Sequence, residues 1–204
     1  TMKIGIMGGT FDPIHYGHLS LAKYAVELFH LDEVWFMPNG NPPHKNHGQI
    51  ESQTKHRVEM VKLAIQKEKH FLLELYEVER KETNYSYLTM EHFQKKYPYH
   101  QFYFLIGADS LFTLDKWKCP DRLLKTCTVL AAYRDDTKEC EMREKIKYLN
   151  QKYNADIRLL NMPDIDISST EIRERLKLRE SIQDLVPETV FNYIQKHELF
   201  KDEL

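Results

Sequence analysis

Short apolar runs alternate with longer amphipathic stretches along the chain. The runs are rich in β-branched and aromatic residues and predict strands at residues 3–8, 33–37, 71–75, 101–106, 128–133 and 156–160. The amphipathic stretches predict helices at residues 18–29, 54–66, 87–97, 139–153, 169–178 and 187–196. This alternation predicts an α/β fold: a Rossmann-like, doubly wound, mostly parallel sheet with helices on both faces and a small C-terminal helical part.

The same pattern predicts a single domain over residues 2–204, with the sheet core at about 2–165 and the helical part at about 166–200. In doubly wound sheets, ligands bind outside the carboxyl ends of the strands. Three segments follow predicted strands and are therefore candidates for a site: residues 8–18, 38–45 and 107–109. The second lies in a loop at 38–48, which contains three prolines and two glycines.

The first candidate segment reads GGTFDPIHYGH. Gly8 and Gly9 let the backbone turn sharply after the first strand, and Thr10 adds a hydroxyl at the same place. His15 and His18 are three residues apart, so they share one face of the first helical turn. Because a helix N-terminus favours phosphate, this cluster indicates a phosphate site. The alternative is a plain helix start that carries exposed histidines.

Gly17, between the two histidines, leaves room where a flat base or a phosphate could pack. The chain contains neither GxGxxG nor GxxxxGK[ST]. The sequence therefore supports neither a dinucleotide fingerprint nor a P-loop.

A second cluster, ISSTEIR at residues 167–173, opens the predicted helix at 169–178. A Ser or Thr cap followed by an acidic residue is an ordinary helix start. Ser169, Thr170 and Arg173 also bring hydroxyls, free amides and a guanidinium to a helix N-terminus, and such a set can hold a polyphosphate. The segment alone supports both interpretations, and the histidine cluster favours the second.

The composition restricts the partners and the metal chemistry. A net charge of −2 and a pI near 6.5 lack the basic surplus of a general nucleic-acid surface. The three cysteines form no CxxC pair, which argues against a zinc knuckle or a thioredoxin-type site. His44 and His47 have metal-like spacing without cysteine or acidic partners nearby, so we expect no metal ligands in the protein.

The sequence predicts a cytoplasmic protein without a membrane partner. No apolar run reaches the ~18 residues that a membrane helix needs, and the N-terminus lacks the pattern of a signal peptide. An odd number of cysteines fits reduced thiols. The chain ends in KDEL, which matches the retention signal of the endoplasmic reticulum; we interpret this match as a coincidence.

The two clusters together carry a specific resemblance. GGTFDPIHYGHL followed by ISSTEIR resembles the nucleotidyltransferases with HxGH and SSTxIR motifs, and most closely the bacterial nicotinate mononucleotide adenylyltransferases. The resemblance extends to residues 32–45, 56–65, 102–117 and the C-terminal VPETVFNYIQKHELF. It implies transfer of the adenylyl group of ATP to nicotinate mononucleotide in NAD biosynthesis, with Mg²⁺ bound through the ATP phosphates.

The resemblance also implies roles for individual residues. His15, His18 and Arg173 would be catalytic by stabilising charge on the phosphates. The ATP site would consist of Gly8, Gly9, Thr10, His15, His18, Gly107, Asp109, Arg134, Ser169, Thr170 and Arg173. The mononucleotide site would consist of Asn39, Lys45, Tyr85, Ser86, Trp117 and Lys118, with the Trp117 indole stacked on the pyridine ring.

The chain departs from the family pattern near the expected pyridine site. The family's SYTxDT is here Asn84–Thr89, with Leu88 in place of the acid, and Lys118 replaces an aromatic residue. Arg134-Asp135 stands for the expected Arg-Pro. Two alternatives therefore stay open. The protein would be a sister enzyme that uses nicotinamide mononucleotide or another phosphorylated acceptor such as phosphopantetheine, or it would be a nucleotide sensor without catalytic activity. A homodimer is compatible with the sequence, which does not determine the oligomeric state.

Overall fold

A computed structural model describes residues 1–40, 53–133, 138–163 and 165–201. Six strands form its sheet: β1 (Lys3–Gly9), β2 (Glu33–Pro38), β3 (Phe71–Leu73), β4 (Gln101–Ile106), β5 (Thr128–Tyr133) and β6 (Ile157–Asn161). The helices are α1 (Tyr16–Phe29), α2 (Thr54–Ile65), α3 (Ser86–Lys96), α4 (Ala108–Thr113), α5 (Pro120–Leu124), α6 (Glu139–Tyr153), α7 (Ser169–Lys177) and α8 (Glu188–Lys196), with a 3-10 turn, η2 (Leu114–Lys116).

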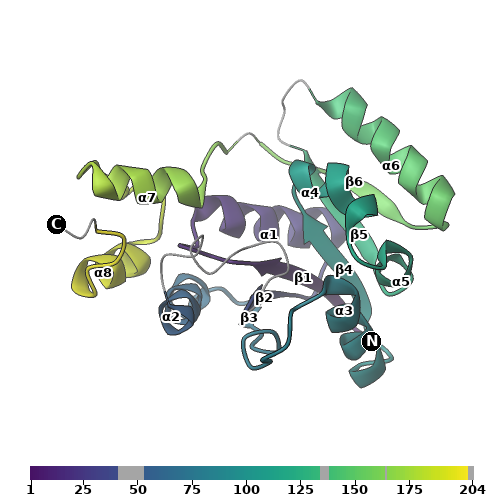
Figure 1. The fold of residues 1–204 in the computed structure, drawn as a ribbon, viewed down its shortest axis with the longest axis horizontal. Helices are drawn as coiled ribbons and strands as arrows, with labels where there is room; N and C mark the ends of the chain where they lie inside the picture. The colour runs from purple at the N-terminus through teal and green to yellow at the C-terminus, as the bar shows by residue number, and fades with distance from the viewer. Residues whose placement is uncertain (41–52, 134–137, 164, 202–204) are drawn as a thin grey trace.

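Every strand pair of the described sheet is parallel, in the order β3-β2-β1-β4-β5-β6. The predicted doubly wound fold is confirmed, and the sheet is parallel throughout rather than only for the most part. From β1 the chain builds outward through β2 and β3, and then returns to place β4 on the other side of β1 (Figure 1). This reversal opens a crevice at the carboxyl ends of β1 and β4, where such folds bind ligands.

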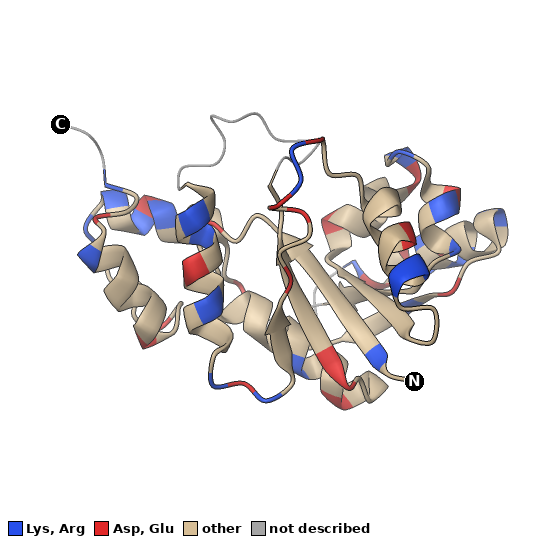
Figure 2. Cartoon of the chain, turned by 90° about the horizontal axis from the view of Figure 1, so that it is seen from below, with Lys and Arg blue, Asp and Glu red and all other residues tan. Residues whose placement is uncertain are grey.

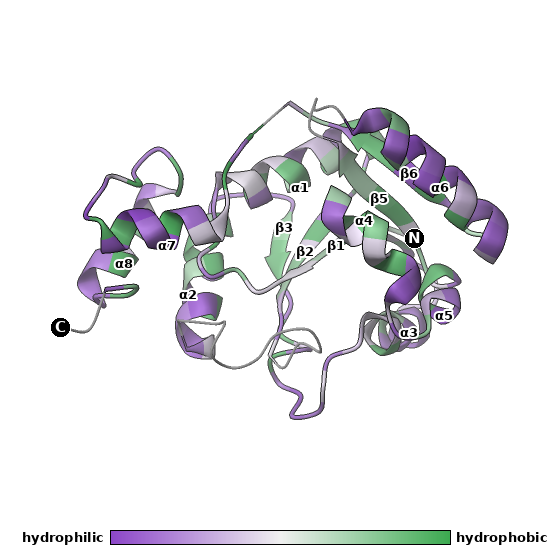
Figure 3. Ribbon diagram, turned by 45° about the horizontal axis from the view of Figure 1, so that its top comes forward, coloured by the Kyte–Doolittle hydropathy of each residue, from purple (hydrophilic) through white to green (hydrophobic). Residues whose placement is uncertain are grey.

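The sheet is buried on both faces, which explains why its strands read as apolar runs rather than as alternating ones. In β2, Val34 and Phe36 belong to one core cluster, whereas Trp35 and Met37 belong to the other. The first cluster joins the sheet to α1, α2, α7 and α8, and the second joins it to α3, α4, α5 and α6. Figure 3 shows the apolar strands between these helices, and Figure 2 shows the charges gathered mainly on helices and loops.

The C-terminal helices α7 and α8 lie together at one end of the molecule, next to α2 (Figure 1). Ile172 of α7 and Val190 of α8 are fully buried in the same core cluster as α1. Within the described ranges, no helix combines the length and the apolar composition needed to cross a bilayer.

The region between β4 and β5 differs from the sequence prediction, which assigns no element there. The structure has α4, η2 and α5 in this region, of six, three and five residues. Segments this short do not complete the two turns over which an apolar period becomes visible. They carry Trp117 and Lys118 to the edge of the crevice.

Candidate active site

The loop from β1 to α1 ends in two histidines that cap each other's backbone. His15 is the N-cap of α1, and its Nδ1 accepts a hydrogen bond from the amide of Gly17 at 3.0 Å. The amide of His15 in turn donates to Nδ1 of His18 at 3.1 Å. The two rings lie with their centroids 3.8 Å apart. The sequence analysis places both histidines in the first helical turn. In the structure His18 lies in that turn, whereas His15 precedes it as the N-cap with an extended backbone.

These contacts determine which ring nitrogen carries the proton. A nitrogen that accepts an N–H must present a lone pair, so Nδ1 is unprotonated in both rings and the proton sits on Nε2. Both imidazoles can therefore donate a hydrogen bond from Nε2 without changing their charge. Protonation at Nδ1 would break a cap of α1. The pair is thus arranged as hydrogen-bond donors rather than as a general base.

Gly17 is needed for the histidine pair itself. A Cβ at this position would lie 2.7 Å from Cε1 and 2.8 Å from Nδ1 of His15. Any side chain would therefore push the His15 ring out of its capping position. This steric reason differs from the sequence interpretation, in which Gly17 makes room for a base or phosphate.

Helix α7, which is distant from this loop in the sequence, contacts the loop in the structure. The Ser169 hydroxyl donates to the carbonyl of Pro13 at 2.8 Å, and Nη1 of Arg173 donates to the carbonyl of Asp12 at 2.8 Å. Ser168 caps the helix by accepting from the amide of Glu171 at 3.1 Å. The capping interpretation is therefore correct, and α7 also brings Ser169 and Arg173 against the histidine loop.

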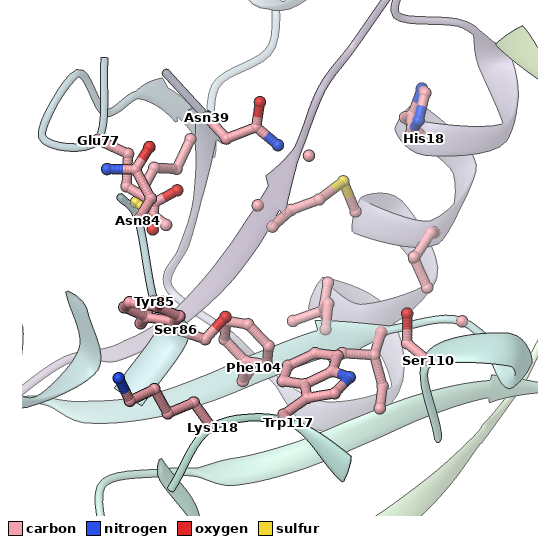
Figure 4. Close-up of a pocket in the computed structure, with 18 residues that line it drawn as sticks. His18, Asn39, Glu77, Asn84, Tyr85, Ser86, Phe104, Ser110, Trp117 and Lys118 are labelled. Atoms are coloured by element: carbon pink, nitrogen blue, oxygen red, sulfur yellow. The ribbon is translucent and has the colours of Figure 1, made fainter. Parts of the chain in front are cut away.

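A cavity of about 350 Å³ lies at the carboxyl ends of β1, β2 and β4 (Figure 4). Residues predicted to bind substrate line it from several elements: Gly8, Gly9, His18, Asn39, Tyr85, Ser86, Gly107, Trp117 and Lys118. In Figure 4, His18 lies at the upper right and Trp117 at the lower centre, with Asn39 and Tyr85 toward the left. The cavity therefore connects the histidine loop with an aromatic end.

Other predicted residues lie outside the lining of this cavity: Thr10, His15, Asp109, Ser169, Thr170 and Arg173. Thr10, His15, Ser169 and Arg173 belong to the β1–α1 loop and its contacts with α7. Asp109 is exposed in the first turn of α4, while its neighbours Gly107 and Ser110 face the cavity. Lys45 and Arg134, together with His44 and His47, fall outside the described residues.

The aromatic end of the cavity combines flat apolar surfaces with a cation. Trp117 and Phe104 meet edge to face with their centroids 6.2 Å apart, and the indole donates to the Thr113 hydroxyl at 3.3 Å. The ammonium of Lys118 lies 4.7 Å from the centre of the Tyr85 ring, within the range of a cation–π contact. This end suits a flat aromatic ring with an anionic substituent.

Two buried polar residues in the lining, Glu77 and Asn84, are missing from the sequence prediction. Glu77 is 6% exposed and accepts from the Thr89 hydroxyl at 2.7 Å. Asn84 accepts from the amide of Gly40 at 3.0 Å. A Cβ on Gly40 would lie 2.7 Å from the carbonyl oxygen of Glu77, so the end of β2 packs tightly on this segment. The loop around Glu77 has no periodic pattern that could have indicated its burial.

Burial raises the pKa of the Glu77 carboxyl. The hydrogen bond from Thr89 and the positive charge of Arg80 lower this pKa, but by less than burial raises it. The folded state therefore holds this proton more tightly than the unfolded chain does, and stability falls as the pH rises through the raised pKa. We expect Glu77→Gln to stabilise the protein above that pKa by on the order of 1 kcal/mol. The gain should vanish below the ordinary carboxyl value of 4.5.

Urea unfolding at a series of pH values measures this difference. Glu79→Gln, which neutralises an exposed carboxyl two residues away, is the matched control. A gain for Glu77→Gln that does not change with pH would contradict the assignment of the effect to the Glu77 charge.

The fold and this site define a member of the cytidylyltransferase-like family, whose model matches residues 6–175. The chain is 43% identical over 195 residues to the probable nicotinate-nucleotide adenylyltransferase of Lachnoclostridium phytofermentans, covering 96% of this chain and 97% of the relative. It is 41% identical over 199 residues to that of Clostridium tetani, covering 98% and 99%. The chain therefore belongs to the nicotinate-nucleotide adenylyltransferase family.

Solved structures agree with this fold. The chain superimposes with a TM-score of 0.80 on the Plasmodium falciparum nicotinic acid mononucleotide adenylyltransferase complexed with NaAD, at 22% identity and over 98% of both chains. The same protein complexed with APC gives a TM-score of 0.77. The doubly wound architecture and its extent along the chain are thus shared with these enzymes.

Proposed function

We propose that this protein transfers the adenylyl group of ATP to nicotinate mononucleotide, giving nicotinate adenine dinucleotide and pyrophosphate in NAD biosynthesis. The observation that carries the proposal is the meeting of the two motifs: α7 donates from Ser169 and Arg173 to the very loop that ends in His15 and His18. The similarity to the relatives, about 40% identity over nearly the full length, supports the same acceptor.

The reaction needs alignment more than acid–base chemistry. A phosphate oxygen of the mononucleotide attacks the α-phosphorus of ATP, a new P–O bond forms, and the bond to the bridging oxygen of the β-phosphate breaks. The electron pair leaves with pyrophosphate. Because the attacking phosphate is already an anion, no base has to remove a proton first. Catalysis then comes from holding the two phosphates in line and from stabilising the charge that develops on them.

We assign both parts of this task to residues that the structure describes. His18 lines the cavity, and we place its Nε2–H on the ATP phosphates with His15, Ser169, Thr170 and Arg173. We assign the aromatic end, with Trp117 and Tyr85, to the pyridine ring, together with Ser86 of the same lining. Gly107 would lie against the adenosine, beside Asp109 at the ribose hydroxyls.

Magnesium would enter with the nucleotide. Among the described residues, no group of three His, Cys, Asp or Glu side chains is placed to hold a metal ion. Mg²⁺ commonly keeps waters and phosphate oxygens as its ligands. We therefore propose that it binds as MgATP through the phosphates. Cytoplasmic location and homodimerisation stay predictions from the sequence.

Pyrophosphate release with ATP and each acceptor tests the function directly. We expect turnover with nicotinate mononucleotide and a lower kcat/KM with nicotinamide mononucleotide. Turnover with the amide or with phosphopantetheine, and none with the acid, would contradict the proposal. ATP binding without any product would favour a nucleotide sensor instead.

Lys118 should contribute to the choice between acid and amide. Its ammonium at the aromatic end would attract the nicotinate carboxylate, which the amide lacks. Because the side chain is exposed, we expect Lys118→Met to lower the acid-to-amide ratio of kcat/KM by only about fivefold. Lys116→Met removes the same charge from the neighbouring turn, outside the cavity lining, and is the control. Equal ratios in the two variants would contradict this role.

A further inference from the structure

Arg57 of α2 is a buried arginine beneath the candidate site. It is 1% exposed, and its guanidinium reaches two backbone carbonyls: Nη1 donates to Thr10 at 2.7 Å and Nη2 to Asn39 at 2.8 Å. Nη2 also lies 3.2 Å from the Thr54 hydroxyl. The two carbonyls belong to different segments, the β1–α1 loop and the residue that follows β2. The planar fork of the guanidinium thus connects these two segments.

Core packing alone does not account for an arginine at this position. Met60 and Val61 follow Arg57 by one helical turn and are fully buried, so an apolar side chain would fit the same face. Burial lowers the pKa of Arg57, and the nearby Asp12 carboxylate opposes that effect. The guanidinium stays charged nonetheless. Its Nε is buried and lacks a hydrogen-bond partner among the described residues. The guanidinium donates to two backbone carbonyls beside the site, which an apolar side chain could not do.

The two segments that Arg57 joins belong to opposite sides of the proposed reaction. Thr10 lies in the loop that ends in the histidine pair, on the ATP side. Asn39 lines the cavity, is predicted to face the mononucleotide, and its Oδ1 is buried without a partner among the described residues. Asn39 strengthens the same junction with two further hydrogen bonds. Its backbone amide donates to the carbonyl of Gly9 at 2.9 Å, and its side-chain Nδ2 donates to the Thr10 hydroxyl at 3.3 Å.

We propose that Arg57 is a positioning residue for adenylyl transfer, which fixes the end of β2 against the β1–α1 loop and thereby aligns the acceptor phosphate with the α-phosphate of ATP. The inference rests on the proposed function. Arg57 does not line the cavity, so the inference involves no contact between Arg57 and substrate. Misalignment by a fraction of an ångström mainly lowers the rate of the chemical step, so loss of the fork should lower kcat more than it changes either KM.

Arg57→Lys tests this proposal. The lysine keeps the charge, but its point-like ammonium cannot span both carbonyls as a planar fork does. We expect kcat per ATP-binding site, with sites counted by titration, to fall about tenfold, while KM for ATP and for nicotinate mononucleotide changes less than about threefold. Thr54→Ala removes only the hydroxyl contact of the same guanidinium and should change kcat per site less than twofold.

A purely structural role for Arg57 predicts a different result. Arg57→Lys would then lower the melting temperature and the number of binding sites but leave kcat per site unchanged, and this outcome would overturn the proposal. If the lysine variant does not fold, Arg57→Gln provides the same comparison without a buried charge. A wild-type protein that releases pyrophosphate with no acceptor would instead refute the proposed function.

Discussion

Replacing His18 with alanine should lower kcat by at least ~10²-fold, the scale of losing a key donor to a developing charge. His18 lines the cavity and presents Nε2–H, because its Nδ1 is engaged by the amide of His15. Alanine removes the donor and one of the mutual caps, which costs about 1 kcal/mol at a helix start. The fold should therefore persist. Steady-state pyrophosphate release gives kcat, and circular dichroism melting reports the fold.

The opposite end of the same helix offers a matched control. His30 is exposed and closes α1 in a left-handed conformation, with φ of 55°. Asparagine tolerates that conformation, so His30→Asn removes the histidine at the C-cap of α1 without straining the chain. It should leave kcat within twofold of wild type. A folded His18→Ala protein with near-normal turnover would refute the role given to His18.

Arg173→Ala should lower kcat/KM for ATP by about 10²-fold. The substitution removes a charge-assisted hydrogen-bond donor to a phosphate, and it also removes a contact that supports the histidine loop. The side chain donates to the Asp12 carbonyl and lies 3.3 Å from the Thr170 hydroxyl. Arg173→Lys should recover part of this loss, because it restores the charge but not the fork geometry. Kinetics at varied ATP and saturating nicotinate mononucleotide provide the measurement.

Arg175 lies on the same helix and is the control for Arg173. It pairs with Glu171 at 2.8 Å in an ordinary helical ion pair, and both side chains are 38% exposed. Such pairs contribute about 0.5 kcal/mol or less, so Arg175→Ala should leave kcat/KM nearly unchanged. Similar losses in the two variants would show that the helix, and not the Arg173 guanidinium, is what the reaction needs.

The sequence predicts the sheet and the histidine cluster because each depends on local pattern. The apolar runs mark all six strands of the described sheet. The bounds of β1, β2 and β6 differ from the prediction by one residue, and β3 ends at Leu73 instead of residue 75. GGTFDPIHYGH contains its own turn, cap and helix start, so the positions of His15 and His18 could be read directly. That α7 contacts this loop could be anticipated only from the resemblance, because no local pattern links residues so far apart.

The contributions of Arg57 and Glu77 could not be predicted in this way. Arg57 stands in a helix whose other side chains suggest an ordinary amphipathic face, and an arginine there is usually solvated. Its burial follows from where α2 packs, next to the ends of β1 and β2. Glu77 lies in a segment without a periodic pattern, and the backbone of Gly40, distant in the sequence, packs closely on it. Both properties arise from tertiary contacts.

The contacts between α7 and the histidine loop also determine when the site can form. Ser169 and Pro13 are 156 residues apart in the chain, and Arg173 and Asp12 are 161 apart. A ribosome therefore makes the loop more than 150 residues before the helix that supports it. The growing chain can complete all six strands, up to Asn161, before that helix exists. Under the proposed function, the newly made protein would gain activity only after α7 has been synthesised.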